Sequence, residues 1–507
     1  MTKTSVILLS LLILFACNAN QDIKTQSKTY TADWESMKDY PVPTWFDDAK
    51  FGIFIHWGAY SVLGYKEGNR GYAEHTPKWI YQKPEHYYPV LQERFGAHPP
   101  EFGYKDIIAR FTAEKWDPDA WAQLFADAGA RYVVLTAEHH DGYALWDSDL
   151  TDWCATKVGP KRDLVGDLGT AVRAQGLKYA PSYHRERHTG FFARDMYAVE
   201  SEPHPDIAAE IQRMPSAEDL YGPFNYDDAF IADYVARWKE IQEKYRPDFM
   251  WLDDIPIFYK ADPQNPQVKK FLQACAGMIA DYLNTAQEWG TDVYLNNKGG
   301  NQNWPVNLGC LEKDNMQVSS IGVKWENPAT LATSYGYMEA EERTDAYRSS
   351  TKMIHLLCDV VSKNGNLLLN IGPKPDGTIP AGMQDRLLGI GKWLQINGEA
   401  IYGTRSWTTF GEGILPNEKN KDQLGRHTVN STGVRYTRSQ GGSTVYAILL
   451  EQPNEVTLKS FQGEAVKQVE LIGSNATITW SANDDGLHVE LPSKKPCDHA
   501  WVLKISQ

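Results

Sequence analysis

Cysteine is scarce in this chain, which has six in 507 residues. The five beyond the N-terminus are scattered, odd in number and without metal-type spacing. This excludes a disulfide framework and gives no sign of a zinc site, although a single pair stays open in an oxidising compartment. We expect no metal and no cofactor. These five are Cys154, Cys275, Cys310, Cys358 and Cys497.

Long basic runs are also lacking, and the formal net charge is −14 at pH 7. Nucleic acids and acidic membrane surfaces require a basic face, so neither is expected as a partner. Beyond the first residues, no stretch reaches the ~18 to 20 apolar residues that span a bilayer. The chain also has no internal repeat and no low-complexity tract.

The N-terminus has the pattern of an export signal. Lys3 precedes an apolar region from Val6 to Phe15, and Leu14-Phe15-Ala16-Cys17 resembles a lipoprotein cleavage site. The resemblance implies a bacterial lipoprotein: residues 1–17 as signal peptide, Cys17 as the lipidated residue and 18–30 as a tether. We expect an exported protein anchored in the cell envelope, periplasmic or on the outer membrane, touching lipid only through this anchor. An ordinary signal peptide with an incidental cysteine is the alternative.

Strand-like apolar runs alternate with helical patterns over most of the chain, which predicts βα units around a parallel sheet. Helical stretches include Pro118 to Ala128 and Ile231 to Tyr245. We predict an α/β fold with a (β/α)8-like, TIM-type barrel over residues 31–407. The candidate strands are 51–56, 132–137, 177–182, 249–253, 293–296, 308–312 and 366–371.

The pattern changes after about Trp407 to short alternating strands, which predicts a C-terminal β-sandwich over 408–507. The candidate strands there are 444–450, 455–458, 467–472, 476–480, 487–491 and 501–505.

Polar residues follow the predicted barrel strands. In a parallel barrel the C-terminal ends of the strands build the active site. Phe249-Met250-Trp251-Leu252-Asp253-Asp254 is the clearest case, and alternation places Trp251 and Asp253 on one face. Aromatic residues make up 12% of the chain and suit sugar stacking, although large cores use them too. The other strand ends carry His56-Trp57-Gly58, Glu138-His139-His140-Asp141-Gly142, Tyr183-His184, Asn297-Lys298 and Glu312-Lys313-Asp314.

Several segments between about Trp45 and Trp407 resemble the α-L-fucosidases of glycoside hydrolase family 29. The resemblance implies a barrel followed by a β-sandwich, and a retaining exo-hydrolase that removes terminal α-L-fucose from oligosaccharides or glycoconjugates. The matching segments are Trp45–Gly58, Glu138–Gly142, Lys161–Asp163, Trp251–Asp253, Val361–Pro373 and Asn397–Gly403.

The family's chemistry requires a carboxylate nucleophile and a second carboxyl group ~5 to 5.5 Å away that acts as acid and then as base. The nucleophile is the aspartate two residues after the strand tryptophan, here Asp253. For the acid/base, Glu312 fits the family's position best, and Glu326 in Trp325-Glu326 is the competitor.

The resemblance also implies a set of sugar-binding residues. His56, His139 and His140 match positions that bind fucose hydroxyls, and an imidazole can donate or accept a hydrogen bond. The usual tryptophan after Glu74 is His75 here, and Lys298 lies where relatives often carry arginine. The aromatic facing the C6 methyl is Tyr335. The complete expected set is His56, Glu74, His139, His140, Tyr183, Trp251, Lys298 and Tyr335.

Three alternatives remain at this stage. Asp253-Asp254 with His139-His140 could form a metal hydrolase, since imidazole and carboxylate bind metals. The barrel could serve a surface glycan-binding lipoprotein without catalysis. The same mechanism could act on other α-L-glycosides, such as α-L-galactosides or sulfated fucans.

Overall fold

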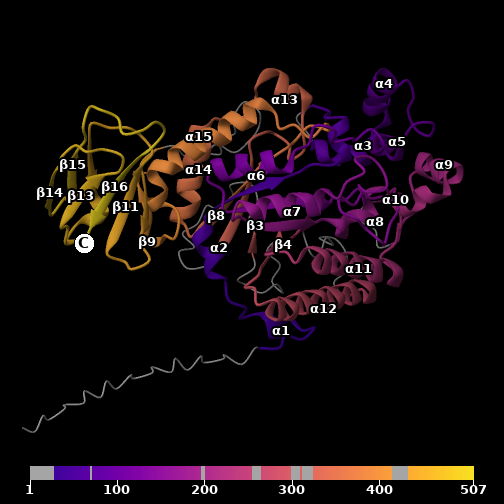
Figure 1. The fold of residues 1–507 in the computed structure, drawn as a ribbon, viewed down its shortest axis with the longest axis horizontal. Coiled ribbons are helices and arrows are strands. Elements are labelled where there is room, and N and C mark those ends of the chain that lie inside the picture. Colours follow the sequence, from indigo (N-terminus) through magenta and orange to yellow (C-terminus); the bar gives the residue numbers. More distant parts are fainter. Residues whose placement is uncertain are drawn as a thin grey trace, which may run out of the picture.

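A computed structural model describes residues 28–68, 71–195, 200–253, 264–298, 309–310, 324–413 and 432–507. Its first part is a closed barrel of eight parallel strands that pair in chain order, with β1 against both β2 and β8 (Figure 1). The predicted barrel is therefore confirmed. The strands are β1 (Phe51–Ile55), β2 (Tyr132–Glu138), β3 (Lys178–Tyr183), β4 (Phe249–Leu252), β5 (Tyr294–Lys298), β6 (Gly309–Cys310), β7 (Trp325–Thr330) and β8 (Gly365–Ile371).

Helices connect the strands and cover the outside of the barrel (Figure 1). The two predicted stretches are confirmed as α6 and α11, which begin at Asp117 and Asp227 caps whose carboxylates accept from backbone N–H groups. The α-helices are α1 (Trp34–Met37), α2 (Thr44–Ala49), α3 (Thr76–Gln82), α4 (Pro84–Phe95), α5 (Tyr104–Ile108), α6 (Pro118–Asp127), α7 (Leu164–Ala174), α8 (His188–Phe191), α9 (Pro205–Arg213), α10 (Glu218–Tyr221), α11 (Asp228–Tyr245), α12 (Pro266–Trp289), α13 (Glu339–Thr344), α14 (Ser350–Ser362) and α15 (Ala381–Asn397). The 3-10 turns are η1 (Ala59–Val62), η2 (Ala73–His75), η3 (Arg185–Arg187), η4 (Pro215–Ala217), η5 (Gly398–Ala400) and η6 (Lys459–Phe461).

Strand β7 was not predicted from the sequence. Its residues, Trp-Glu-Asn-Pro-Ala-Thr, contain no apolar run, yet five of the six are buried. The reason is that Glu326 faces a set of hydrogen-bond donors inside the barrel. The Tyr132 hydroxyl and Asn296 Nδ2 lie 2.6 and 2.7 Å from its carboxylate oxygens. A polar strand can be buried when such partners are present.

The N-terminal ends of the strands are closed by α2. The Phe46 ring stacks on Tyr294, with centroids 3.7 Å apart, and contacts Tyr132 and Phe249. Tyr294, Tyr132 and Phe249 are each the first residue of a strand. The barrel is therefore sealed at this end, and access to its interior is from the opposite end.

The C-terminal part has two antiparallel sheets, in the orders β13-β16-β11-β10-β9 and β12-β15-β14. The predicted β-sandwich is confirmed, but β9 and β10 were not predicted, and the expected boundary at 407 falls inside β9. Trp407 packs on Tyr436 and Phe461 and so belongs to this second core. The strands are β9 (Arg405–Glu412), β10 (Val434–Arg438), β11 (Thr444–Leu449), β12 (Glu455–Leu458), β13 (Gln468–Leu471), β14 (Thr479–Asn483), β15 (Gly486–Glu490) and β16 (Trp501–Ser506).

The five-stranded sheet packs against α14 and α15 on the outside of the barrel (Figure 1). The fully buried Arg435 of β10 pairs with Asp359 of α14 at 2.6 Å. Trp393 of α15 donates its indole N–H to the Ala500 carbonyl at 2.9 Å. Apolar residues in and next to β11 and β16 join the barrel's own core, so the two parts share a packed interface. They are Tyr446, Ile448, Leu450, Ala500 and Val502.

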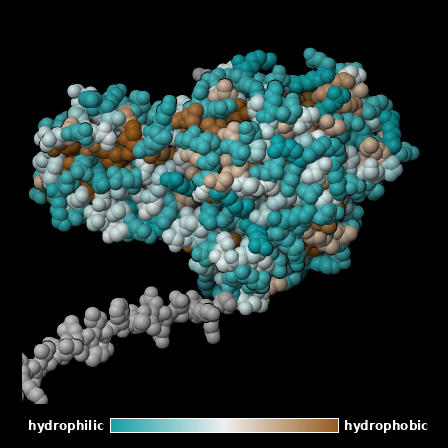
Figure 2. Space-filling model, viewed as in Figure 1, coloured by the Kyte–Doolittle hydropathy of each residue, from teal (hydrophilic) through white to brown (hydrophobic). Residues whose placement is uncertain are grey.

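The predicted signal peptide and Cys17 lie outside the described residues. Tyr30, the last residue of the expected tether, is fixed to the barrel: its backbone N–H and carbonyl both bond the Asn284 amide. In the described part of the chain, no helix is long and apolar enough to cross a membrane. The face shown in Figure 2 is largely hydrophilic, with small apolar patches.

Candidate active site

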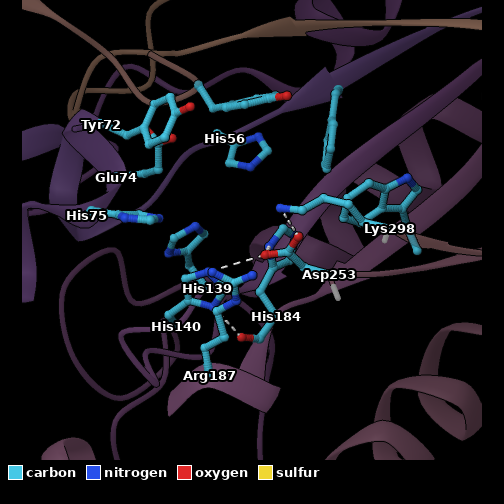
Figure 3. Close-up of a pocket in the computed structure, with 13 residues that line it drawn as sticks. His56, Tyr72, Glu74, His75, His139, His140, His184, Arg187, Asp253 and Lys298 are labelled. Carbon is cyan, nitrogen blue, oxygen red and sulfur yellow. Dashed lines mark hydrogen bonds and ion pairs between the residues drawn. The ribbon is translucent and has the colours of Figure 1, made fainter. Parts of the chain in front are cut away.

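A pocket of about 240 Å³ opens at the C-terminal ends of the strands (Figure 3). Its walls combine aromatic rings with imidazoles, carboxylates and two cations. Such a mixture can stack on a sugar ring and bond its hydroxyls. The lining residues are Phe54, His56, Tyr72, Glu74, His75, His139, His140, His184, Arg187, Trp251, Asp253, Lys298 and Tyr335.

Asp253 lies one residue beyond β4 and is 3% exposed. Lys298 Nζ contacts its Oδ1, while His140 Nε2 and His184 Nδ1 lie 3.2 and 3.3 Å from its Oδ2 (Figure 3). Burial alone would raise the pKa of this carboxyl, but Lys298 and the His184 imidazole outweigh that effect, and the pKa lies well below its ordinary value. The site therefore holds a carboxylate that stays ionised.

The histidines around Asp253 are held by the backbone and by neighbouring side chains. His140 Nδ1 lies 2.7 Å from the His184 carbonyl, which can only accept, so Nδ1 carries a proton and Nε2 faces Asp253. His184 Nε2 lies 2.6 Å from Ser182 Oγ. Burial lowers the pKa of His140 to about 3 and lowers the pKa values of His56 and His139 as well. These imidazoles are neutral hydrogen-bonding groups at physiological pH.

A second group comes from the segment after β7 and from η2. Glu74 is buried and accepts the Gly336 backbone N–H at 2.8 Å, and burial raises its pKa to about 7. The Tyr335 ring lies 4.7 Å from the His56 ring. Asn370 links the two, because its Nδ2 donates to the Tyr335 carbonyl and its Oδ1 lies 2.7 Å from His56 Nδ1. The sugar-facing wall is thus fixed to strand β8.

A buried ion-pair network supports the loop that carries His139 and His140. Glu138, at the end of β2, pairs with Arg185 at 2.6 Å and Arg237 at 3.4 Å. Both arginines also pair with Asp233 of α11. Because Glu138 directly precedes His139, this network ties the end of β2 to the loop after β3 and to α11.

Seven of the eight expected sugar-binding residues line one pocket together with Asp253: His56, Glu74, His139, His140, Trp251, Lys298 and Tyr335.

The structure does not bring Tyr183 into the pocket. Its side chain lies on the outer face of β3, where the hydroxyl donates to the Tyr234 carbonyl of α11 at 2.9 Å. Its ring packs on Tyr234 and Trp238. The pocket is instead lined by the next residue, His184.

The two candidates for the acid/base have different outcomes. Glu312 lies outside the described residues. Glu326 is fully buried in the barrel interior, where the Trp251 indole N–H, the Asn296 amide and the Tyr132 hydroxyl surround its carboxylate. Burial raises its pKa to about 7. It does not line the pocket, and its contacts hold the Trp251 wall in place.

Five pocket residues were not expected as site residues from the sequence: Phe54, Tyr72, His75, His184 and Arg187. Strand alternation could have found two of them, since Phe54 shares a face with His56, and His184 shares one with Ser182. Tyr72, His75 and Arg187 lie on loops and short turns, where no periodicity marks them.

The fold and the site together define a class. A TIM-type barrel with an ionised carboxylate at the C-terminal ends of its strands, in a pocket with aromatic walls, has the parts of a glycoside hydrolase.

Comparison with known proteins gives the family. The sequence pattern of alpha-L-fucosidase matches residues 17–399, and that of the alpha-L-fucosidase C-terminal domain matches 427–506. The tissue alpha-L-fucosidase of Bos taurus is 34% identical over 505 residues, which cover 95% of this chain and 92% of the relative. The tissue alpha-L-fucosidase of Homo sapiens is 32% identical over 521 residues, 98% and 96% of the two chains.

Comparison with solved structures points to the same family. The Thermotoga maritima alpha-fucosidase in complex with a mechanism-based inhibitor has a TM-score of 0.74 and 31% identity, covering 94% of this chain and 100% of that one. The same protein in complex with fucose has a TM-score of 0.71. The chain belongs to the α-L-fucosidase family, glycoside hydrolase family 29.

Proposed function

We propose that this enzyme removes terminal α-L-fucose from glycans with retention of configuration, through a covalent fucosyl-enzyme on Asp253. The observation that carries the proposal is the ionised Asp253 in the wall of a pocket of about 240 Å³. Its oxygen attacks C1 of the sugar while the C1–O bond breaks and the leaving alcohol takes a proton from the acid. Water then attacks C1 and gives a proton to the same group, while the bond between C1 and the Asp253 oxygen breaks, which releases fucose and restores the carboxylate.

Glu312 is our proposed acid and base. A retaining enzyme needs this carboxyl group ~5 to 5.5 Å from the nucleophile, within reach of the leaving oxygen. The described contacts of Glu326 support the choice, because its oxygens already accept three donors inside the barrel. Such a group holds its neighbours and has no path to a glycosidic oxygen.

Sugar recognition follows from the pocket walls. His56, His139 and His140 are neutral and can bond ring hydroxyls either as donors or as acceptors. Phe54, Trp251 and Tyr335 supply apolar surface for the sugar ring and its C6 methyl. A methyl-sized contact contributes ~1 to 3 kcal/mol, so fucosides should be preferred over α-L-galactosides by about 10- to 200-fold.

The first experiment tests the nucleophile. Asp253→Gly should lose more than about 10³-fold in kcat on 4-nitrophenyl α-L-fucoside. Added azide should restore nitrophenolate release, because azide attacks C1 from the face that the missing carboxylate leaves open and gives β-fucosyl azide. An active variant, or a rescued product of α configuration, would refute this role.

Azide also distinguishes the roles of Glu312 and Glu326. In Glu312→Ala the nucleophile remains, so azide should attack the fucosyl-enzyme and give α-fucosyl azide. Glu326→Ala should lose activity without any gain from azide. Azide rescue of Glu326→Ala, and not of Glu312→Ala, would reverse the assignment.

The cellular site is also part of the proposal. The N-terminal pattern that ends at Cys17 supports an exported lipoprotein anchored in the bacterial envelope. Cells that express the full chain should incorporate a labelled fatty acid into the protein, and Cys17→Ser should abolish the label. Labelling that persists in this variant would exclude Cys17 as the lipidated residue.

A further inference from the structure

Three histidines from two separate loops converge in the pocket. His75, His139 and His140 each offer one ring nitrogen, and these nitrogens all lie within 4.8 Å of one another. The His139 and His140 ring centroids are 4.3 Å apart, and the His75 ring lies 5.8 and 5.6 Å from them (Figure 3). Three imidazoles at this spacing can be a ligand set for a borderline-soft transition-metal ion.

His140 lines the pocket with its Nδ1–H already used by a backbone carbonyl. His140 Nδ1–H is committed to the His184 carbonyl at 2.7 Å, so Nε2 presents its lone pair to Asp253 Oδ2 at 3.2 Å. A donated Nδ1–H is also the arrangement that orients a metal-binding histidine.

His139 provides a second observation. It is 4% exposed, and its Nδ1 has no hydrogen-bond partner among the described residues. A buried ring nitrogen without a partner loses the hydrogen bond it would make in water, and an ion bound by the histidine cluster would offset that loss.

We propose that His75, His139 and His140 bind one Zn²⁺ or Cu²⁺ ion, and that this ion inhibits the enzyme by competing with the sugar. The ion occupies the space that a fucose hydroxyl needs, and its charge lies beside the Asp253 carboxylate that must attack C1. Hard cations such as Mg²⁺ and Ca²⁺ prefer oxygen ligands and should not bind. Because the ion and the sugar exclude each other, the ion takes no part in the proposed reaction.

Zn²⁺ binding is measured first on the unreacted protein and does not depend on the proposed function, whereas the competition with L-fucose rests on it. Isothermal titration of the purified full chain with Zn²⁺ should show one site per chain, and saturating L-fucose should abolish it. Cu²⁺ should give an electron paramagnetic resonance spectrum with nitrogen coupling. Unchanged Zn²⁺ binding in the presence of L-fucose would overturn the proposal.

Inhibition is then measured with 4-nitrophenyl α-L-fucoside. Zn²⁺ should raise the apparent KM without changing kcat, and a chelator should reverse the effect. His75→Phe keeps a ring but removes a ligand, and should raise the inhibition constant for Zn²⁺ by at least about tenfold whatever its own activity.

Two variants serve as controls. His86→Phe removes a histidine on α4 that is 42% exposed, and Cys497→Ser removes a partly buried thiol. Both should leave the inhibition constant unchanged. A tenfold rise in either of them, or noncompetitive inhibition in the wild type, would place the ion elsewhere and refute the site.

Discussion

Asp253 keeps its negative charge although it is almost closed to water, because Lys298 and the His184 imidazole lie against it. Lys298→Met removes the cation among these groups, so the pKa of Asp253 should rise. Activity requires the ionised form, and the acidic limb of the kcat/KM profile should therefore move to higher pH. Lys178→Met, which breaks the pair with Asp248 near the start of β3, is the control and should leave the limb in place. An unshifted limb in Lys298→Met would mean that other groups set this pKa.

Glu326 should make stability depend on pH. Burial raises its pKa from 4.5 to about 7, so its contribution to the free energy of unfolding is fully present below the ordinary pKa and is lost as pH rises through about 7. Glu326→Gln resembles the protonated form and cannot ionise. In urea unfolding, the variant should gain stability relative to the wild type between about pH 4.5 and 7 and stay level above that. A constant difference would contradict the raised pKa.

At the level of residues, the alternation of side chains along each strand predicts much of the site. Residues 54 and 56, 182 and 184, 251 and 253, and 296 and 298 form pairs that share a face, and the second member of each pair lies at or just past its strand end. This alternation identified Asp253. The same rule, applied to β3, would have selected His184 over Tyr183. His139 and His140 are adjacent and both line the pocket, because they follow the strand, where alternation no longer applies.

At the scale of elements, the network of Glu138, Arg185, Asp233 and Arg237 joins β2, the loop after β3 and α11. Arg185 is 2% exposed, so Arg185→Met leaves the buried Glu138 carboxylate without its nearest cation. We expect a loss of about 3–5 kcal/mol in the free energy of unfolding, measured in urea. Arg213→Met, which breaks an exposed pair with Glu101, should change it little. Equal effects would mean that the network does not support this end of the barrel.

Elements with apolar runs were predictable, and polar ones were not. Strands β1 to β5 and β8 follow the hydrophobic pattern, whereas β7 is buried through the hydrogen bonds of Glu326, which a single sequence does not reveal. In the second domain, β9 has a mostly half-buried pattern, and its partner β10 begins after the residues 414–431 that the structure does not describe.

At the scale of the whole molecule, the barrel and the C-terminal sheets share buried contacts through α14 and α15. A chain that ends at Thr404 would expose the apolar surface that β11 and β16 cover, and would leave Asp359 without Arg435. We expect this truncated chain to be insoluble, and the full chain to unfold in one calorimetric transition. A soluble, active barrel, or two separate transitions, would show that the domains are independent.

The closed end of the barrel affects how an anchored enzyme would be oriented relative to the membrane. Tyr30, Tyr40 and Trp45 bind α12 and the start of β5, so the chain leaves the barrel at the end opposite the pocket. If Cys17 is anchored as proposed, the 11 residues to Lys28 reach at most about 40 Å. The enzyme would be held by a short tether, with its pocket facing away from the lipid. Its substrates would then be the ends of glycan chains in the surrounding solution. Fucolipids in the same leaflet would lie beyond its reach.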